Sequence, residues 1–213
     1  MSSSFLQALA GTHLYPITDR RLSGLSHAEQ VAQLCDGGAT LIQLREKLES
    51  PLIFYREAEA ALRVAHDHGV KIIINDRVDI ALALRAAGVH LGPDDLPPDA
   101  ARRILGPDAI IGFSTRNLEQ AKFAAQRPVD YVAIGPIFAT STKQSSNPPV
   151  GLDGLAHVSQ SLGSLPLVAI GGITAENIES VIRAGANVAA VISDIWDPGE
   201  GFQRKMKRLL NAL

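Results

Sequence analysis

Hydrophobic residues gather in eight short runs along the chain, and stretches with helical spacing separate these runs. The run over 71–75 is continuously apolar from Ile72 to Ile74, which is typical of a parallel strand covered on both sides. Polar residues and glycines interrupt the pattern at the end of each run. The predicted strands are 14–17, 41–47, 71–75, 89–91, 109–113, 131–134, 167–170 and 188–192.

The segments between the strands carry start and stop signals for helices. Ser50 and Pro51 open the longest one, with proline at the first helical position and Gly69 beyond its end. Thr174 is expected to cap a later helix, which Gly185 ends. The predicted helices are 26–36, 50–68, 78–86, 97–105, 117–126, 155–161, 174–184 and 198–211.

Eight strand–helix units follow one another without a linker, a low-complexity run or a charge block. Eight parallel strands close a barrel with helices outside, and the chain length suits a compact barrel. An open doubly wound sheet is the alternative, but it usually has a glycine fingerprint after its first strand, and residues 17–20 contain no glycine. The sequence therefore predicts an α/β fold, a single-domain (β/α)8 TIM barrel over residues 1–213.

Composition excludes several other classes of protein. Of the 213 residues 46% are hydrophobic, and the formal net charge is -2, so no global field attracts nucleic acid or an anionic membrane. No apolar run approaches a membrane span, and the first residues lack the features of a signal sequence, so a soluble cytoplasmic protein is expected. Cys35 cannot form an internal disulfide and falls on the apolar stripe of a helix. We expect no nucleic-acid or membrane partner, and a homo-oligomer stays open.

The second predicted strand has an unusual polar pattern. Alternate side chains of a strand point to opposite faces, so Gln43, Arg45 and Lys47 share one face. A buried cation is costly unless it is paired, so this face should open onto a cleft or meet an anion. Arg45 offers a planar fork suited to phosphate, and Lys47 offers a compact point charge. A strand end that frays into solvent would explain these three residues equally well.

Other polar residues follow the remaining strands at the barrel end where active sites form. Asp76 and Asp95 have simple alternative roles, as a helix cap and a turn residue. Two carboxylates beside a cluster of cations nevertheless indicate a magnesium site, because Mg²⁺ takes one or two carboxylates plus substrate phosphate oxygens. Lys143 would be a solvated charge in most proteins, and His90, between apolar neighbours, is more typical of a core histidine than of a catalyst.

Gly171 and Gly172 follow the seventh strand, where barrels often bind a monophosphate through backbone N–H groups. Glycine lets the backbone approach an anion closely, although a simple turn is the alternative. The sequence thus supports two anion sites in one barrel mouth, a metal-assisted diphosphate site and a backbone monophosphate site. An enzyme that joins a diphosphate-bearing electrophile to a monophosphorylated nucleophile would need this pair.

Several motifs, in order along nearly the whole chain, resemble the thiamine-phosphate synthase family. They are 43–47 (QLREK), 74–81 (INDRVDIA), 88–92 (GVHLG) with Asp95, 135–138 (GPIF) with 140–143 (TSTK), and 169–173 (AIGGI). The resemblance implies a barrel enzyme that joins hydroxymethylpyrimidine diphosphate to a thiazole phosphate, yielding thiamine phosphate and pyrophosphate with magnesium. It also implies dissociative chemistry, in which pyrophosphate departs before the thiazole nitrogen captures a methylene cation.

The resemblance further implies roles for single residues. Asp76 and Asp95 would hold Mg²⁺, and the small phosphorylated substrates would be the partners. Candidate catalytic residues are Arg45, Lys47, Ser114 and Lys143. The pyrimidine diphosphate would be bound by Gln43, Arg45, Lys47, Asn75, Ser114 and Lys143, and the thiazole phosphate by Thr140, Thr142, Gly172, Ile192 and Ser193.

Four positions depart from the family pattern, namely Pro93, Arg116, Ala139 and Asp194. Asp194 matters most, because a carboxylate beside the second phosphate loop could repel a phosphate. Two alternatives to a synthase stay open. The thiazole tautomerase branch typically lacks the asparagine–aspartate pair and the threonine–lysine loop. A non-catalytic ligand-binding or regulatory barrel would hold the pyrimidine diphosphate without releasing pyrophosphate.

Overall fold

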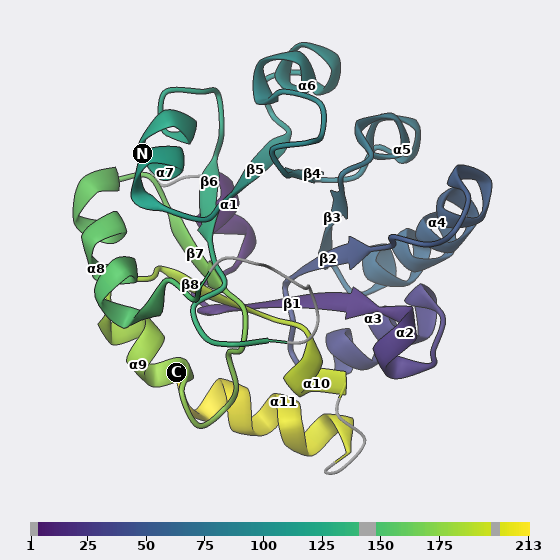
Figure 1. Ribbon diagram of the computed structural model, residues 1–213. Helices are drawn as coiled ribbons and strands as arrows, with labels where there is room; N and C mark the ends of the chain where they lie inside the picture. The colour runs from purple at the N-terminus through teal and green to yellow at the C-terminus, as the bar shows by residue number, and fades with distance from the viewer. Residues whose placement is uncertain (1–3, 141–147, 197–200) are drawn as a thin grey trace.

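The computed structural model describes residues 4–140, 148–196 and 201–213, which form a closed barrel of eight parallel strands. Each strand pairs with the next along the chain, and β8 pairs with β1 to close the barrel. Figure 1 shows the helices arranged around the strands, and the predicted (β/α)8 architecture is confirmed. The strands are β1 (Leu14–Asp19), β2 (Leu41–Arg45), β3 (Lys71–Asn75), β4 (Gly88–Leu91), β5 (Ile110–Thr115), β6 (Tyr131–Ile134), β7 (Leu167–Ile170) and β8 (Val188–Val191).

The sequence signals explain where several helices begin. Ser26 accepts a hydrogen bond from the Glu29 N–H, and the Glu29 carboxylate accepts one from the Ser26 N–H, so the two residues form a capping box at the start of α3. Ser50 caps the next helix by accepting the Ile53 N–H. The helices are α1 (Ser4–Ala8), α2 (Arg20–Ser23), α3 (His27–Asp36), α4 (Pro51–Asp67), α5 (Val78–Leu84), α6 (Pro98–Leu105), α7 (Leu118–Ala124), α8 (Gly151–Leu162), α9 (Ile178–Arg183), α10 (Ser193–Trp196) and α11 (Phe202–Asn211).

Several helices differ from the predicted pattern in their presence or their start. Helices α1, α2 and α10 have only 5, 4 and 4 residues, too few to give a periodic signal. The helix predicted over 198–211 is shorter, because α11 begins at Phe202. Thr174 does not cap α9, which begins after Asn177, because the Asn177 side chain accepts the Thr174 N–H at 2.9 Å and holds a turn there.

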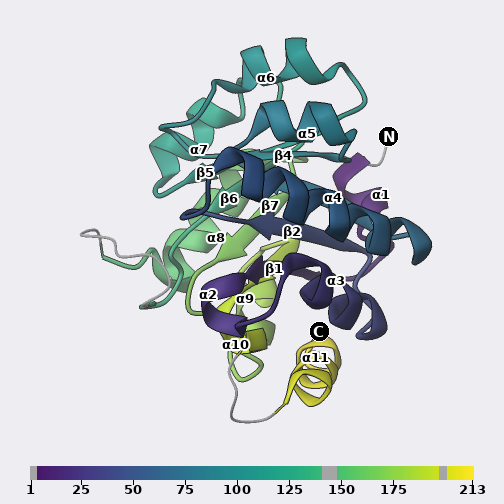
Figure 2. The same ribbon diagram turned by 90° about the vertical axis from the view of Figure 1, so that its right-hand side faces the viewer.

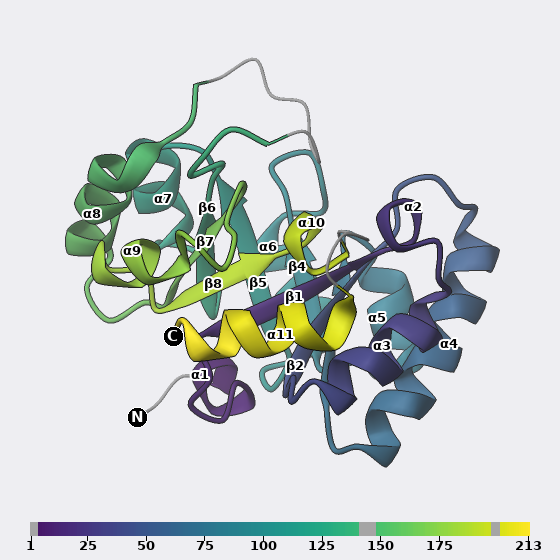
Figure 3. The ribbon, with the colours of Figure 1, turned by 90° about the horizontal axis from the view of Figure 1, so that it is seen from below.

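The strands separate an outer hydrophobic layer from an inner one. Ile72 and Ile74 of β3 face outward into the main core, whereas Ile73 faces inward and packs with the barrel interior. Helices α3, α4 and α5 lie side by side on the outside of the barrel (Figure 2). Helix α1 lies at the amino end of β1 (Figure 3), where Phe5 stacks on Tyr131 with ring centroids 4.0 Å apart. Aromatic side chains therefore fill the interior near that end of the barrel.

Two expectations from composition can be compared with the structure. Cys35 is half-buried and packs against the main core, and burial raises the pKa of its thiol to about 11, so it is a poor nucleophile. Among the described residues, no helix has both the length and the apolar character needed to cross a membrane.

Candidate active site

The carboxyl ends of the strands surround a cavity of about 220 Å³. Every predicted site residue that the structure describes lines this cavity, so side chains from β2 to β8 meet at one place. Thr142 and Lys143 lie outside the described residues. Although the roles of the lining residues stay predictions, the structure brings together Gln43, Arg45, Lys47, Asn75, Asp76, Asp95, Ser114, Thr140, Gly172, Ile192 and Ser193.

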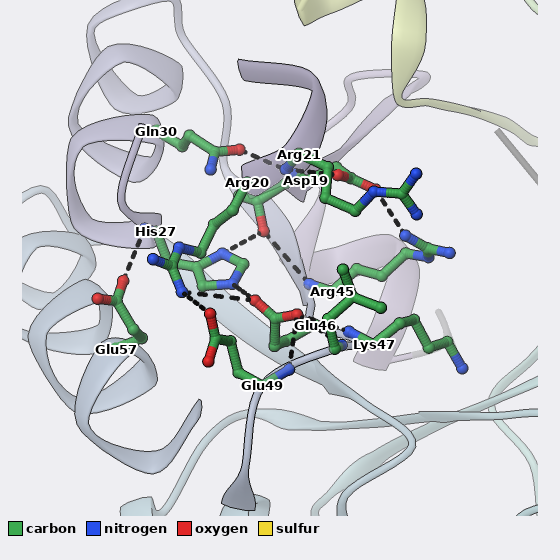
Figure 4. A network of polar contacts seen from close by, with 12 residues as sticks. Asp19, Arg20, Arg21, His27, Gln30, Arg45, Glu46, Lys47, Glu49 and Glu57 are labelled. Carbon is green, nitrogen blue, oxygen red and sulfur yellow. Dashed lines mark hydrogen bonds and ion pairs between the residues drawn. The ribbon is translucent and has the colours of Figure 1, made fainter. Parts of the chain in front are cut away.

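Gln43 and Arg45 of β2 line the cavity, as strand alternation predicts, and so does Lys47. The strand is shorter than predicted, because it ends at Arg45 and Lys47 lies in the loop that follows. Arg45 Nη1 donates to Asp19 Oδ2 at 2.6 Å, because the strand register places these two residues side by side on β1 and β2 (Figure 4). Lys47 Nζ forms an ion pair with Asp76. The Arg45 side chain is only 17% exposed, so a strand end that frays into solvent is excluded for this residue.

Glu46 is the first residue after β2, and its carboxylate holds the loop that begins there (Figure 4). Its Oε1 accepts the N–H groups of Lys47 at 2.8 Å and Leu48 at 2.9 Å. Burial opposes ionisation of Glu46, but these backbone hydrogen bonds outweigh it and lower the pKa of the carboxyl below its ordinary value. Its Oε2 lies 3.7 Å from Nε2 of the buried His27. The backbone of Lys47 is therefore fixed, which limits the space that its side chain can reach.

Asp76 adopts a backbone conformation that is uncommon for a residue other than glycine. Its φ of 62° lies in the left-handed region, and its N–H donates to the His90 carbonyl oxygen at 2.8 Å. Arg77 occupies the N-cap position of α5, so the helix-cap alternative for Asp76 is not what the structure has. Strained residues of this kind cluster at functional sites. The strain at Asp76 agrees with a functional carboxylate at the cavity wall.

Asp76 and Asp95 form a carboxylate pair that fits magnesium. Burial, together with the neighbouring Asp76, raises the pKa of Asp95, whose Oδ2 accepts the Gly92 N–H at 2.7 Å. A bound cation would relieve the repulsion between the two carboxylates, and Mg²⁺ prefers such oxygen ligands. Within the described ranges, no group of three or more His, Cys, Asp or Glu side chains is placed to hold a metal ion. Substrate or water oxygens would therefore complete the coordination.

Asn75 and Ser114 bring neutral polar groups to the cavity. Asn75 is 6% exposed, and its Nδ2 has no hydrogen-bond partner among the described residues. A buried donor without a partner is costly, which favours a ligand acceptor at this position. Ser114 Oγ lies 2.8 Å from Nε2 of His90. His90 is buried and hydrogen-bonded, as a core histidine is expected to be, yet it also lines the cavity.

The loop after β7 brings its backbone to the cavity. Gly171 and Gly172 have φ values of 100° and 65°, which favour glycine. A Cβ atom at Gly172 would lie 2.6 Å from the carbonyl oxygen of Ala139, so a larger residue would displace the neighbouring loop. Both glycines line the cavity without a side chain, so their backbone can contact a ligand at this wall.

Asp194 points away from this wall. Its Oδ1 accepts a hydrogen bond from Lys205 Nζ at 3.1 Å, and its Oδ2 accepts the Ala175 N–H at 3.2 Å. Asp194 is not among the cavity-lining residues, whereas Ser193 beside it is. The concern that this carboxylate repels a phosphate is therefore not supported by its position.

Asp19, His90 and Arg116 are polar residues of the site that the sequence analysis did not assign to it. Asp19 pairs with Arg45, His90 contacts Ser114, and Arg116 lines the cavity. Strand register would have indicated the first of these, because two residues at matching strand ends are neighbours across the sheet. Arg116 was visible only as a departure from the family pattern.

Comparison with known proteins agrees with this geometry. A family model described as thiamine monophosphate synthase matches residues 14–195. The thiamine-phosphate synthase of Azorhizobium caulinodans is 48% identical over 183 residues, which cover 84% of this chain and 85% of that protein. The Clostridium novyi protein of the same name is 46% identical over 199 residues, covering 93% and 97%. The solved structure of thiamine phosphate pyrophosphorylase from Pyrococcus furiosus is 35% identical, with a TM-score of 0.84 over 94% of this chain and 95% of that one. The chain belongs to the thiamine monophosphate synthase family.

Proposed function

We propose that the chain is a thiamine-phosphate synthase. It joins 4-amino-2-methyl-5-hydroxymethylpyrimidine diphosphate to 4-methyl-5-(2-hydroxyethyl)thiazole phosphate, or to the carboxylated form of this thiazole, and releases pyrophosphate. One observation carries the proposal: the same cavity is lined by Arg45 of β2 and Lys47 just after it, by a carboxylate pair and by a glycine loop. The cations and carboxylates suit a diphosphate with its metal, and the glycine loop suits a monophosphate.

The proposed reaction is a substitution at the methylene carbon of the pyrimidine. The bond from this carbon to the diphosphate oxygen breaks, and its electron pair leaves with pyrophosphate. The aminopyrimidine ring stabilises the resulting cation until the thiazole nitrogen forms the new C–N bond, and the carboxylated thiazole also loses CO2. Because negative charge builds on the leaving group, stabilising that charge is the main task of the site.

Arg45 and Lys47 bind the diphosphate in this proposal. Both are paired with carboxylates in the structure, Arg45 with Asp19 and Lys47 with Asp76. The Lys47 side chain is 43% exposed, so its ion pair is weak enough to exchange for a substrate oxygen. Asp76 would then be available as a metal ligand. The more buried Arg45 stays held by Asp19 and presents its remaining donors to the substrate.

The other residues follow from their place around the cavity. Asp76 and Asp95 would hold Mg²⁺, which when bound would supply positive charge to the diphosphate oxygens. The neutral side chains of Gln43, Asn75 and Ser114 orient the pyrimidine diphosphate, with Lys143 assigned only by resemblance. The thiazole phosphate lies against Thr140, Gly172, Ile192 and Ser193, and Thr142 is again assigned only by resemblance.

The test is incubation of the purified protein with both substrates and magnesium, followed by thiochrome detection of thiamine phosphate and a separate assay of pyrophosphate. We expect both products in equal amounts, and neither when one substrate is omitted. Binding of the pyrimidine diphosphate without pyrophosphate release would instead identify a ligand-binding barrel. The cytoplasmic location stays a prediction, and the oligomeric state stays open.

A further inference from the structure

Three side chains connect Gln43 to Ser114 through the interior of the barrel. Gln43 Nε2 donates to Tyr15 Oη at 3.2 Å, and Tyr15 Oη lies 3.2 Å from Tyr131 Oη. Tyr131 Oη lies 2.9 Å from His90 Nδ1, and His90 Nε2 lies 2.8 Å from Ser114 Oγ. Gln43 and Ser114, at the two ends of this hydrogen-bonded series, line the cavity, whereas the two tyrosines are almost fully buried.

The donor at Gln43 sets the direction of all these hydrogen bonds. Tyr15 accepts from Gln43, and its other polar partner among the described residues is Tyr131, so its own proton is directed to Tyr131 Oη. Tyr131 in turn donates to His90 Nδ1. A neutral imidazole that accepts at Nδ1 carries its proton on Nε2, which then donates to Ser114 Oγ. Burial raises the pKa of Tyr15 and of Tyr131, so both phenols keep their protons.

Packing around Tyr131 holds its hydroxyl in place. The ring is stacked between Phe5 of α1 and His90, with interplanar angles of 21° on both sides. A Cβ atom at Gly112 would lie 2.1 Å from Tyr131 Cζ, so the ring lies directly against the backbone of β5. A ring confined in this way keeps its hydroxyl directed at His90.

We propose that Tyr131 is a positioning residue that holds His90 in the Nε2–H tautomer and so makes Ser114 a hydrogen-bond donor toward the cavity. Because His90 fills one lone pair of Ser114 Oγ, the Ser114 proton is directed at an acceptor atom of the pyrimidine diphosphate. This catalytic consequence rests on the proposed function, whereas the tautomer of His90 does not.

The tautomer is measured by ¹⁵N NMR of the histidine rings in protein without substrates, with the resonances of His90 assigned by their loss in His90→Gln. We expect a proton-bearing Nε2 and an unprotonated Nδ1. The opposite tautomer would overturn the proposal. In Tyr131→Phe the Nδ1 resonance is expected to shift, because its donor is removed, and an unchanged resonance would equally overturn the role of Tyr131.

Kinetics test whether Tyr131 acts through Ser114. Tyr131→Phe should lower kcat roughly tenfold, the order of one hydrogen bond, with KM changed less than about twofold. In a Ser114→Ala background the same change should have no further effect, and two additive losses would show that Tyr131 does not act through Ser114. Tyr55→Phe is the matched control, because Tyr55 bonds only to Glu59 on the outer helix α4 among the described residues and should keep the wild-type rate. If the expected tautomer is found in a protein without synthase activity, the proposed function fails and the positioning of His90 stands.

Discussion

Replacing Lys47 with glutamine separates its stabilising role from its catalytic one. The ion pair with Asp76 is partly exposed, with side-chain exposures of 43% and 19%. Exposed pairs contribute at most about 1 kcal/mol, so the free energy of unfolding should fall by less than that. Loss of a charge-assisted contact to the leaving diphosphate should raise the activation barrier by about 3 kcal/mol, which is about a hundredfold in rate. The two effects therefore differ enough to be measured separately.

Single-turnover release of pyrophosphate is the appropriate assay, because it isolates the chemical step from product departure. The loss should fall on kcat more than on substrate binding, since the attraction grows as charge builds on the leaving group. Arg63→Gln is the control, because it removes another exposed ion pair, with Glu59 on α4, far along the outer face of the barrel. A wild-type rate in Lys47→Gln would refute the role of this cation in the mechanism.

Three further changes test the metal pair, the barrel interior and the glycine loop. Burial and a neighbouring carboxylate raise the pKa of Asp95, so protons should compete with magnesium there at a higher pH than at an ordinary carboxylate. The magnesium concentration that gives half-maximal activity should therefore rise as the pH falls toward that pKa. A concentration that stays constant with pH would contradict this role. Gly112→Ala places Cβ 2.1 Å from Tyr131 Cζ, and such overpacking should lower the free energy of unfolding by about 1–3 kcal/mol. Each kcal/mol should lower Tm by roughly 2–4 °C. An unchanged melting curve would show that the Tyr131 ring can move aside. Gly172→Ala places Cβ 2.6 Å from the Ala139 oxygen, so KM for thiazole phosphate should rise far more than KM for the pyrimidine substrate, and equal increases would indicate general distortion.

The barrel itself could be predicted from the sequence, because its strands and main helices depend on local patterns. Continuous apolar runs and capping residues such as Ser26 and Ser50 act within a few positions of each other. The short helices α1, α2 and α10 could not be predicted in this way, because a single turn has no periodicity. The predicted start of α9 was wrong for a related reason. Thr174 is a residue type that often caps helices, but the Asn177 side chain accepts its N–H and forms a turn before the helix.

The candidate site was predictable to the extent that strand ends determine it. Barrel topology places residues after β2 to β8 in one mouth, so Asp76 and Asp95 could be grouped although 19 positions separate them in the numbering. What the sequence could not supply is how the charges are paired. The Arg45–Asp19 pair depends on the register between β1 and β2, and the orientation of Asp194 depends on Lys205 of α11.

The interior of this barrel joins its two ends through polar side chains as well as through packing. Phe5 at the amino end stacks on Tyr131, and Tyr131 reaches the cavity through His90. Inward-facing layers of a barrel are most often branched apolar residues, which fill space without specifying a hydrogen-bond direction. Two phenols and an imidazole at these positions are costly to bury unless each is paired, and each is paired here. Because the pairing ends at Ser114, the same side chains that close the barrel core also determine which hydrogen-bond donor the cavity presents to a substrate.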